Sequence, residues 1–179
     1  MNLYLRLVWL LLRMWRTPPR ALLDESRVAF RVMPNDCDIN FHMNNGRYLS
    51  LMDLGRVHLM RQSGLLKVIL TEKWMPVLAA AEINFIRSLA PLQRYELVTQ
   101  LTSWDEKYFY IEHKFEVAGR LHAHAFVKGV FLKGGKVVPN TEIVAKAGHA
   151  GAPPPMPEEL RLWAELGSAK RERADTKTQ

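Results

Sequence analysis

Cysteine is nearly absent from this sequence of 179 residues, and the only one is Cys37. One cysteine cannot form an intrachain disulfide, so a disulfide-stapled secreted scaffold is excluded and a reducing compartment such as the cytoplasm is expected. Asp36 and Asp38 flank this thiol on both sides. Neighbouring negative charge raises the pKa of a thiol, which argues against a thiolate nucleophile. We therefore interpret Cys37 as a small packing residue.

Motifs of several functional classes are missing as well. The sequence has no Gly-rich phosphate-binding loop and no Gly-x-Ser-x-Gly elbow, which argues against kinases, nicotinamide-dependent enzymes and serine hydrolases. It has no dense basic stripe interleaved with aromatic residues, so nucleic acid is not an expected partner. His122 and His124 share one face of a predicted strand but lack the further ligands that zinc needs. We expect no metal and no organic cofactor.

The first 20 positions contain no acidic residue, and four arginines there supply +4 of the formal net charge of +7: Arg6, Arg13, Arg16 and Arg20. Residues 3–15 are otherwise apolar, but a transmembrane helix needs about 20 such residues. Trp9 and Trp15 beside arginines favour peripheral membrane contact through residues 1–17, with the first three arginines meeting anionic lipid. The alternative is a helix packed on the domain or on a dimer partner.

The composition is ordinary for a globular domain, with 48% hydrophobic and 24% charged residues. The Pro18-Pro19 pair ends the N-terminal segment, so residues 1–20 are expected to form a basic helical appendage. Residues 21–150 form the predicted domain. Residues 151–179 are predicted to be a Pro-rich spacer followed by a C-terminal helix and tail, whose apolar face is expected to dock through three residues: Leu160, Trp163 and Leu166.

Apolar periodicity predicts a long helix followed by antiparallel strands. Residues 45–62 carry apolar side chains on most faces, which is typical of a buried helix. Residues 65–74 are expected to be a connection. Alternating apolar and polar residues predict strands at residues 26–33, 75–87, 95–104, 108–117 and 121–132. Gly134-Gly135 predicts a hairpin turn before residues 136–138. A helix on one face of an antiparallel sheet is an α+β fold.

The most informative segment is residues 36–48, which read Asp-Cys-Asp-Ile-Asn-Phe-His-Met-Asn-Asn-Gly-Arg-Tyr. It places two carboxylates, one imidazole and three amides directly before the long helix. These groups move protons and orient water, and a helix N-terminus offers backbone N–H groups to a developing oxyanion. A simpler interpretation is that Asp36, Asn44 or Asn45 only caps the helix. The number of polar groups exceeds what capping needs and favours a functional site.

The order Asp-x-Asp-x-x-x-His-Met-Asn-Asn-x-x-Tyr resembles the signature of hotdog-fold thioesterases. The 4-hydroxybenzoyl-CoA thioesterase branch uses the second Asp of its pair, which implies Asp38. Acyl-ACP thioesterases imply Asp38 together with Asn40 and His42. Thioesterase-superfamily-member-6-like proteins are the most similar branch, because they share His-Met-Asn-Asn-x-Arg-Tyr-Leu and a later Trp-Asp-x-x-x-Phe-Tyr, here residues 104–110. The resemblance covers about Val28 to Val138.

The resemblance implies a hotdog fold, in which an antiparallel sheet wraps a central helix, and hydrolysis of an acyl-CoA or acyl-ACP thioester. It implies Asp38 as general base or nucleophile, with Asn40 and His42 orienting water or the carboxylate. Backbone N–H groups of Asn45 or Gly46 would bind the oxyanion. The residues expected to contact substrate are Phe41, Asn44 and Tyr48. Relatives often carry Gly where this sequence has Phe41, and a bulky side chain there is expected to narrow or redirect the acyl path.

The resemblance also implies a homodimer or tetramer, with the acyl chain in an apolar cleft between subunits. Two other functions stay open at this point. One is a hotdog protein that binds acyl groups or lipid at the membrane without catalysis. The other is a hotdog dehydratase acting on 3-hydroxyacyl thioesters, although the order of the motif suits a thioesterase better.

Overall fold

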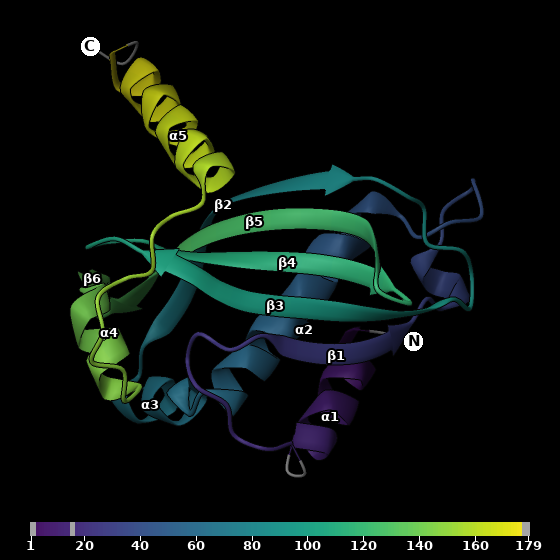
Figure 1. Cartoon of the computed structure of the whole chain (residues 1–179), viewed down its shortest axis with the longest axis horizontal. Helices are drawn as coiled ribbons and strands as arrows, with labels where there is room; N and C mark the ends of the chain where they lie inside the picture. The colour runs from purple at the N-terminus through teal and green to yellow at the C-terminus, as the bar shows by residue number, and fades with distance from the viewer. Residues whose placement is uncertain (1–2, 15–16, 177–179) are drawn as a thin grey trace.

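The computed structural model describes residues 3–14 and 17–176 (Figure 1). Within these ranges the elements are, in chain order, α1 (Leu3–Met14), β1 (Ser26–Arg31), the 3-10 turn η1 (Pro34–Asp36), α2 (Asn45–Gln62), α3 (Leu65–Glu72), β2 (Met75–Phe85), β3 (Arg94–Trp104), β4 (Phe109–Val117), β5 (Arg120–Lys133), β6 (Lys136–Val138), α4 (Asn140–Lys146) and α5 (Glu158–Thr176).

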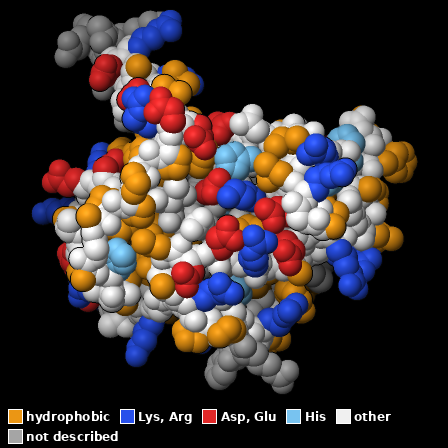
Figure 2. All heavy atoms as spheres, in the orientation of Figure 1, with side chains coloured by type: hydrophobic (Ala, Val, Ile, Leu, Met, Phe, Trp, Pro, Cys, Tyr) orange, Lys and Arg blue, Asp and Glu red, His pale blue; other side chains and the backbone are white. Residues whose placement is uncertain are grey.

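The strands form one antiparallel sheet in the order β1-β3-β4-β5-β2, and β6 pairs with β5. The sheet curls over α2, which crosses its inner face (Figure 1). Alternate residues of β1 are buried and exposed, because successive side chains of a strand point to opposite faces. The outer face of the sheet carries interspersed acidic and basic side chains (Figure 2). This arrangement confirms the predicted α+β hotdog fold.

The central helix α2 runs over the predicted residues 45–62. Its N-cap is Asn44, whose side-chain oxygen accepts the Gly46 N–H at 2.9 Å. Leu51, Met52 and other apolar residues of α2 are buried against the sheet. One face stays open, where Leu49 is 43% exposed. The helix is therefore buried over most of its circumference but not all of it.

Two short helices were not predicted. The expected connection at residues 65–74 is instead the helix α3, whose Leu65 and Ile69 are buried in a second apolar cluster with Trp74. Gly64 adopts a positive φ of 77° just before it, a conformation open to glycine that lets the chain turn and begin again. The helix α4 closes the same cluster through Ile143.

The C-terminal helix docks on the sheet at its beginning. Leu160 is fully buried and Trp163 is packed against the same small cluster as Tyr110 and Phe126. The expectation that Leu166 docks is wrong, because Leu166 is 53% exposed. The reason is visible in Figure 1, where α5 projects away from the sheet after its first turns.

The N-terminal helix α1 packs on the domain, beside β1 and α2 (Figure 1). Its inner face buries Leu10 and Arg6, each 1% exposed. The expectation that Arg6 meets lipid is therefore wrong, because its guanidinium is paired with Asp36 inside the protein. Trp15 and Arg16, which belonged to the same expectation, lie outside the described residues. In the described part of the chain, every helix is too short or too polar to cross a membrane.

Candidate active site

The signature residues form a tight loop between η1 and α2. The Asp38 N–H donates to the His42 carbonyl at 3.1 Å, and the Phe41 N–H donates to the Asp38 carbonyl at 3.1 Å. Cys37 and Met43 close the loop through an antiparallel bridge. Asp38, Asn40 and His42 are thereby brought together on one five-residue turn.

Asp36 is the buried anchor of this loop. Its side chain is inaccessible to solvent and pairs with Arg6 and Arg47. The Met33 N–H also donates to its carboxylate, at 2.8 Å. A buried carboxylate needs such partners, and here they come from α1, from the residue just before η1 and from the first turn of α2. Asp36 therefore holds the loop in place and is not open to a substrate.

Asp38 has the opposite environment. Its side chain is 23% exposed, and its Oδ1 atom accepts the Asn40 N–H at 2.9 Å. The His42 Nδ1 atom lies 3.8 Å from the same oxygen, which is longer than a hydrogen bond but close enough for one to form after a small rotation. Of the two carboxylates of the segment, Asp38 is the one that water or a substrate can reach.

The N-terminus of α2 lies directly after this loop. Asn44 acts as the N-cap, as the simpler interpretation of these residues expected, and its side chain occupies the Gly46 N–H. The first N–H groups of a helix have no partner within the helix. Of the two predicted oxyanion donors, the Gly46 group is used by the cap, so the Asn45 group is the better placed one.

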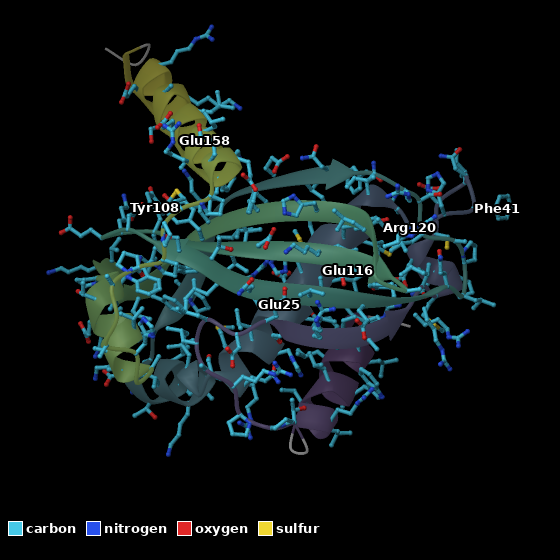
Figure 3. All side chains as sticks on the ribbon, in the orientation of Figure 1. Glu25, Phe41, Tyr108, Glu116, Arg120 and Glu158 are labelled. Atoms are coloured by element: carbon cyan, nitrogen blue, oxygen red, sulfur yellow. The ribbon has the colours of Figure 1, made fainter. Side chains whose placement is uncertain are left out.

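The remaining predicted contacts point in different directions. Phe41 is 80% exposed and stands away from the body of the protein (Figure 3). Its φ of 57° is positive, a conformation that glycine adopts without strain. Tyr48 instead is buried in the core, where its ring packs edge-on against Phe85 and Phe115. Burial raises the pKa of Tyr48 to about 12, so this phenol stays protonated at neutral pH.

The pKa of the Cys37 thiol is shifted in the direction that its two acidic neighbours predict. Burial, followed by the negative charges of Asp36 and Asp38, raises the pKa of the Cys37 thiol. A protonated thiol is a poor nucleophile. The interpretation of Cys37 as a packing residue agrees with this direction.

An apolar cavity of about 220 Å³ lies further along α2. Its walls come from the second half of α2, the start of β2, the neighbouring ends of β3 and β4, and α4. Asp53 and Leu78 are exposed residues of the lining, so they mark its mouth between α2 and β2. Eight residues of helix separate Asn45 from Asp53, which corresponds to about 12 Å. The mouth of the cavity therefore lies about 12 Å along α2 from the residue that follows the loop.

A buried polar chain supports the wall of this cavity. Arg56 pairs with Asp53 and reaches the ring of the fully buried His113. Burial, and then the positive charge of Arg56, lowers the pKa of His113 well below its usual value. The neutral Nε2 atom therefore accepts from Arg56, and the Nδ1–H is left to donate to the Thr99 hydroxyl at 3.0 Å.

Sequence reasoning missed the two arginines that fix the loop. Arg47 is part of the quoted motif, yet the motif alone gives it no partner. Arg6 lies 30 residues from Asp36, so no local spacing links them. A carboxylate just before a helix that has an arginine in its first turn is the signal that could have indicated the pair of Asp36 and Arg47.

Known proteins provide an independent comparison. The chain is 40% identical to a protein named THEM6 from Danio rerio over 113 residues, which are 63% of this chain and 56% of that protein. It is 31% identical to the protein of the same name from Xenopus laevis, over 80% of this chain and 69% of that protein. The crystal structure of YbaW, a probable thioesterase from Escherichia coli, superposes with a TM-score of 0.63 and 21% identity, and covers 67% of this chain and 94% of that chain.

The chain spans little more than half of the zebrafish relative, while the structural similarity at low identity supports the fold itself. The family model of the thioesterase-like superfamily matches residues 32–164. This range begins just before the Asp36 anchor and ends within α5, so it contains the loop, the central helix and the strands β2 to β6, but not β1. The chain belongs to the thioesterase-like superfamily.

Proposed function

We propose that this protein hydrolyses an acyl thioester, of CoA or of acyl-carrier protein, to the free acid and the thiol. The observation that carries the proposal is the contrast between the two carboxylates of one loop. Asp36 is buried and paired with two arginines, whereas Asp38 is accessible at the N-terminus of the central helix. Membership of the thioesterase-like superfamily supports the same reaction class.

The proposed reaction follows from these positions. The thioester carbonyl lies against the first turn of α2, where the Asn45 N–H stabilises the oxyanion. Asp38 removes a proton from water, and the water oxygen bonds to the carbonyl carbon. The carbon–sulfur bond then breaks, and the thiolate leaves and is protonated to the thiol. Direct attack by Asp38 would instead give an anhydride that water hydrolyses. In both cases Asn40 and His42 orient the reacting groups.

The apolar cavity beside Asp53 is the proposed site for the acyl chain, with the polar carrier outside its mouth. The N-terminal basic charge favours anionic carriers, and both CoA and acyl-carrier protein are anionic.

The proposed assembly is a homodimer built on β2. This strand is the last of the sheet and pairs only with β5 in the described part of the chain. Its Met75, Leu78 and Phe85 are between 44% and 57% exposed. An exposed apolar edge strand pairs readily with a second one. We expect a dimer or tetramer by light scattering, and Leu78→Lys should give monomers. Leu70→Lys, at an exposed leucine of α3, is the matched control and should leave the mass unchanged.

The test of the activity is a panel of acyl-CoA and acyl-ACP thioesters, followed by release of free thiol. Asp38→Asn should reduce turnover at least a hundredfold, since general-base catalysis contributes about 10² to 10⁴. The melting temperature should stay within a few degrees of the wild type, because Asp38 is partly exposed. Near-normal turnover by folded Asp38→Asn would remove Asp38 from this role. Acyl binding without thiol release by the wild type would favour the non-catalytic alternative.

A further inference from the structure

The helix α1 is apolar on two opposite faces, and only one of them is covered. The inner face buries Arg6 and Leu10 against the domain. On the outer face, five apolar side chains are between 41% and 73% exposed: Tyr4, Leu5, Val8, Leu11 and Leu12. At 100° per residue they fall within one arc of about 120°. A folded protein has no internal reason to keep such a continuous apolar stripe in water.

Exposed arginines lie at the end of α1 and next to it, beyond the edge of the apolar arc. The sequence has no acidic residue before Asp24. Arg13 is exposed at the end of α1, and its guanidinium lies 4.9 Å from the centre of the Trp9 ring. Arg20 and Arg61 are exposed nearby, since the Arg20 N–H donates to the carbonyl of Gln62 at the end of α2. The surface thus combines an apolar stripe, an aromatic ring and exposed arginines.

We propose that the outer face of α1 docks in the plane of an anionic lipid bilayer. The apolar stripe enters the boundary between headgroups and acyl chains, which is the usual position of an amphipathic interfacial helix. Arg13 and its neighbours bind lipid phosphates, and Trp9 lies at the headgroup level. The helix has 12 residues and is too short to span a bilayer, so it lies on the surface. On this proposal, the inner face of α1 packs on the domain and the outer face contacts the membrane.

A second copy of this chain fits the face less well. A helix of 12 residues is about 18 Å long and presents a stripe about 10 Å wide, far less than the roughly 800 Å² per partner of a stable interface. The helix also lies beside β1, at the opposite edge of the sheet from β2. Its outer face is therefore separate from the proposed dimer edge.

Docking of α1 would also place the loop that contains Asp38 near the bilayer, because the inner face of the helix contacts the start of this loop. Arg6 contacts Asp36, which is two residues from Asp38. A bilayer on the outer side of α1 would lie about one helix diameter, roughly 10 Å, from this contact. On the basis of the proposed function, docking holds the loop close to thioesters whose acyl chains partition into lipid.

The test is sedimentation of the full chain with vesicles, which needs no enzymatic turnover. The probes are vesicles of phosphatidylcholine alone and of phosphatidylcholine with phosphatidylglycerol. The triple variant Leu5→Gln/Val8→Gln/Leu12→Gln should bind the anionic vesicles at least about tenfold less than the wild type. The matched control, Leu70→Gln/Leu162→Gln/Leu166→Gln, removes three equally exposed leucines of α3 and α5 and should bind like the wild type.

A second variant tests the charge without changing the apolar stripe. Arg13→Gln/Arg61→Gln should weaken binding to anionic vesicles by about fivefold per arginine, and added salt should reduce wild-type binding in the same way. Equal sedimentation of wild type and triple variant would overturn the proposal, and so would absence of binding by both. A change of oligomeric mass in the triple variant without any vesicle binding would also overturn it and assign the face to a second copy.

Discussion

Both the Nε and the Nη2 atoms of Arg47 donate to one carboxylate oxygen of Asp36, at 3.0 and 2.8 Å. This pair ties the residue before the candidate loop to the first turn of α2. Because Arg6 and the Met33 N–H take the other oxygen, one buried carboxylate joins three separate segments of the chain. The loop is therefore fixed at its beginning and can stay exposed at its tip.

Asp36→Asn should lower the free energy of unfolding by about 3–5 kcal/mol, because removing one partner leaves buried charges uncompensated. Urea unfolding would measure it. Glu96→Gln is the matched control, since Glu96 and its partner Arg27 are 53% and 43% exposed, and it should cost less than about 1 kcal/mol. A value for Asp36→Asn equal to that of the control would contradict the anchoring role.

Phe41→Gly should stabilise the protein by about 0.5–1 kcal/mol. A left-handed residue with a Cβ atom costs about 1–2 kcal/mol, while the extra freedom of glycine in the unfolded chain offsets part of the gain. Little packing is lost, because Phe41 is 80% exposed. Phe41→Ala keeps the Cβ atom and should stay near the wild type in thermal or urea unfolding. If the two variants had equal stability, backbone strain would not explain the position.

Gly55→Ala should destabilise the protein by about 1–3 kcal/mol, even though alanine favours helices more than glycine does. A Cβ atom there would overlap the Thr99 side chain and lie 2.9 Å from the Leu97 side chain. Urea unfolding of Gly55→Ala in a Thr99→Ala background provides the control. The cost should be smaller there, since the overlapping side chain is gone. An unchanged cost would exclude this clash as the cause.

His58 should make stability depend on pH between about 6.5 and 4. It is 5% exposed, and its Nδ1 atom lies 2.6 Å from the Ser26 hydroxyl. Burial, and then the positive charges of Arg13 and Arg20, lowers its pKa to about 4. Between pH 6.5 and 4, His58 is therefore protonated in the unfolded chain but stays neutral in the folded protein. The resulting stabilisation is complete above pH 6.5 and is lost as the pH falls towards 4, by up to about 3 kcal/mol.

His58→Asn removes this titration and keeps an acceptor for the Ser26 hydroxyl. Urea unfolding at several pH values should show a weaker decline between pH 6.5 and 4 for the variant than for the wild type. The buried His113 contributes in the same direction in both proteins, so only the difference between them reports on His58. Identical declines would show that His58 titrates normally.

The sequence predicted the long elements because their signals are local. The bounds of α2 follow from the Asn44 cap, the apolar pattern and Ser63-Gly64, and the strands follow from alternation. The helices α3 and α4 have 8 and 7 residues. Over two turns a helical period is hard to separate from a connection that carries a few apolar residues.

For the candidate site, the sequence indicated which residues share the loop but not how they contact the rest of the protein. Local motifs indicated the loop that contains Asp38 and the pKa direction of Cys37. They did not indicate that Arg6 pairs with Asp36, or that Tyr48 lies in the core. Such contacts form between segments that are far apart in the sequence, and the local patterns of a single sequence do not indicate which distant segments pack together.

The pairing of the strands also determines when this protein can fold during synthesis. β1 pairs with β3, and β2 pairs with β5, so neither of the first two strands has a partner until residues 94 and 120 have been made. Until then α1, β1 and α2 carry their apolar surfaces without a sheet to cover them. Such non-local pairing slows folding and exposes the chain to aggregation.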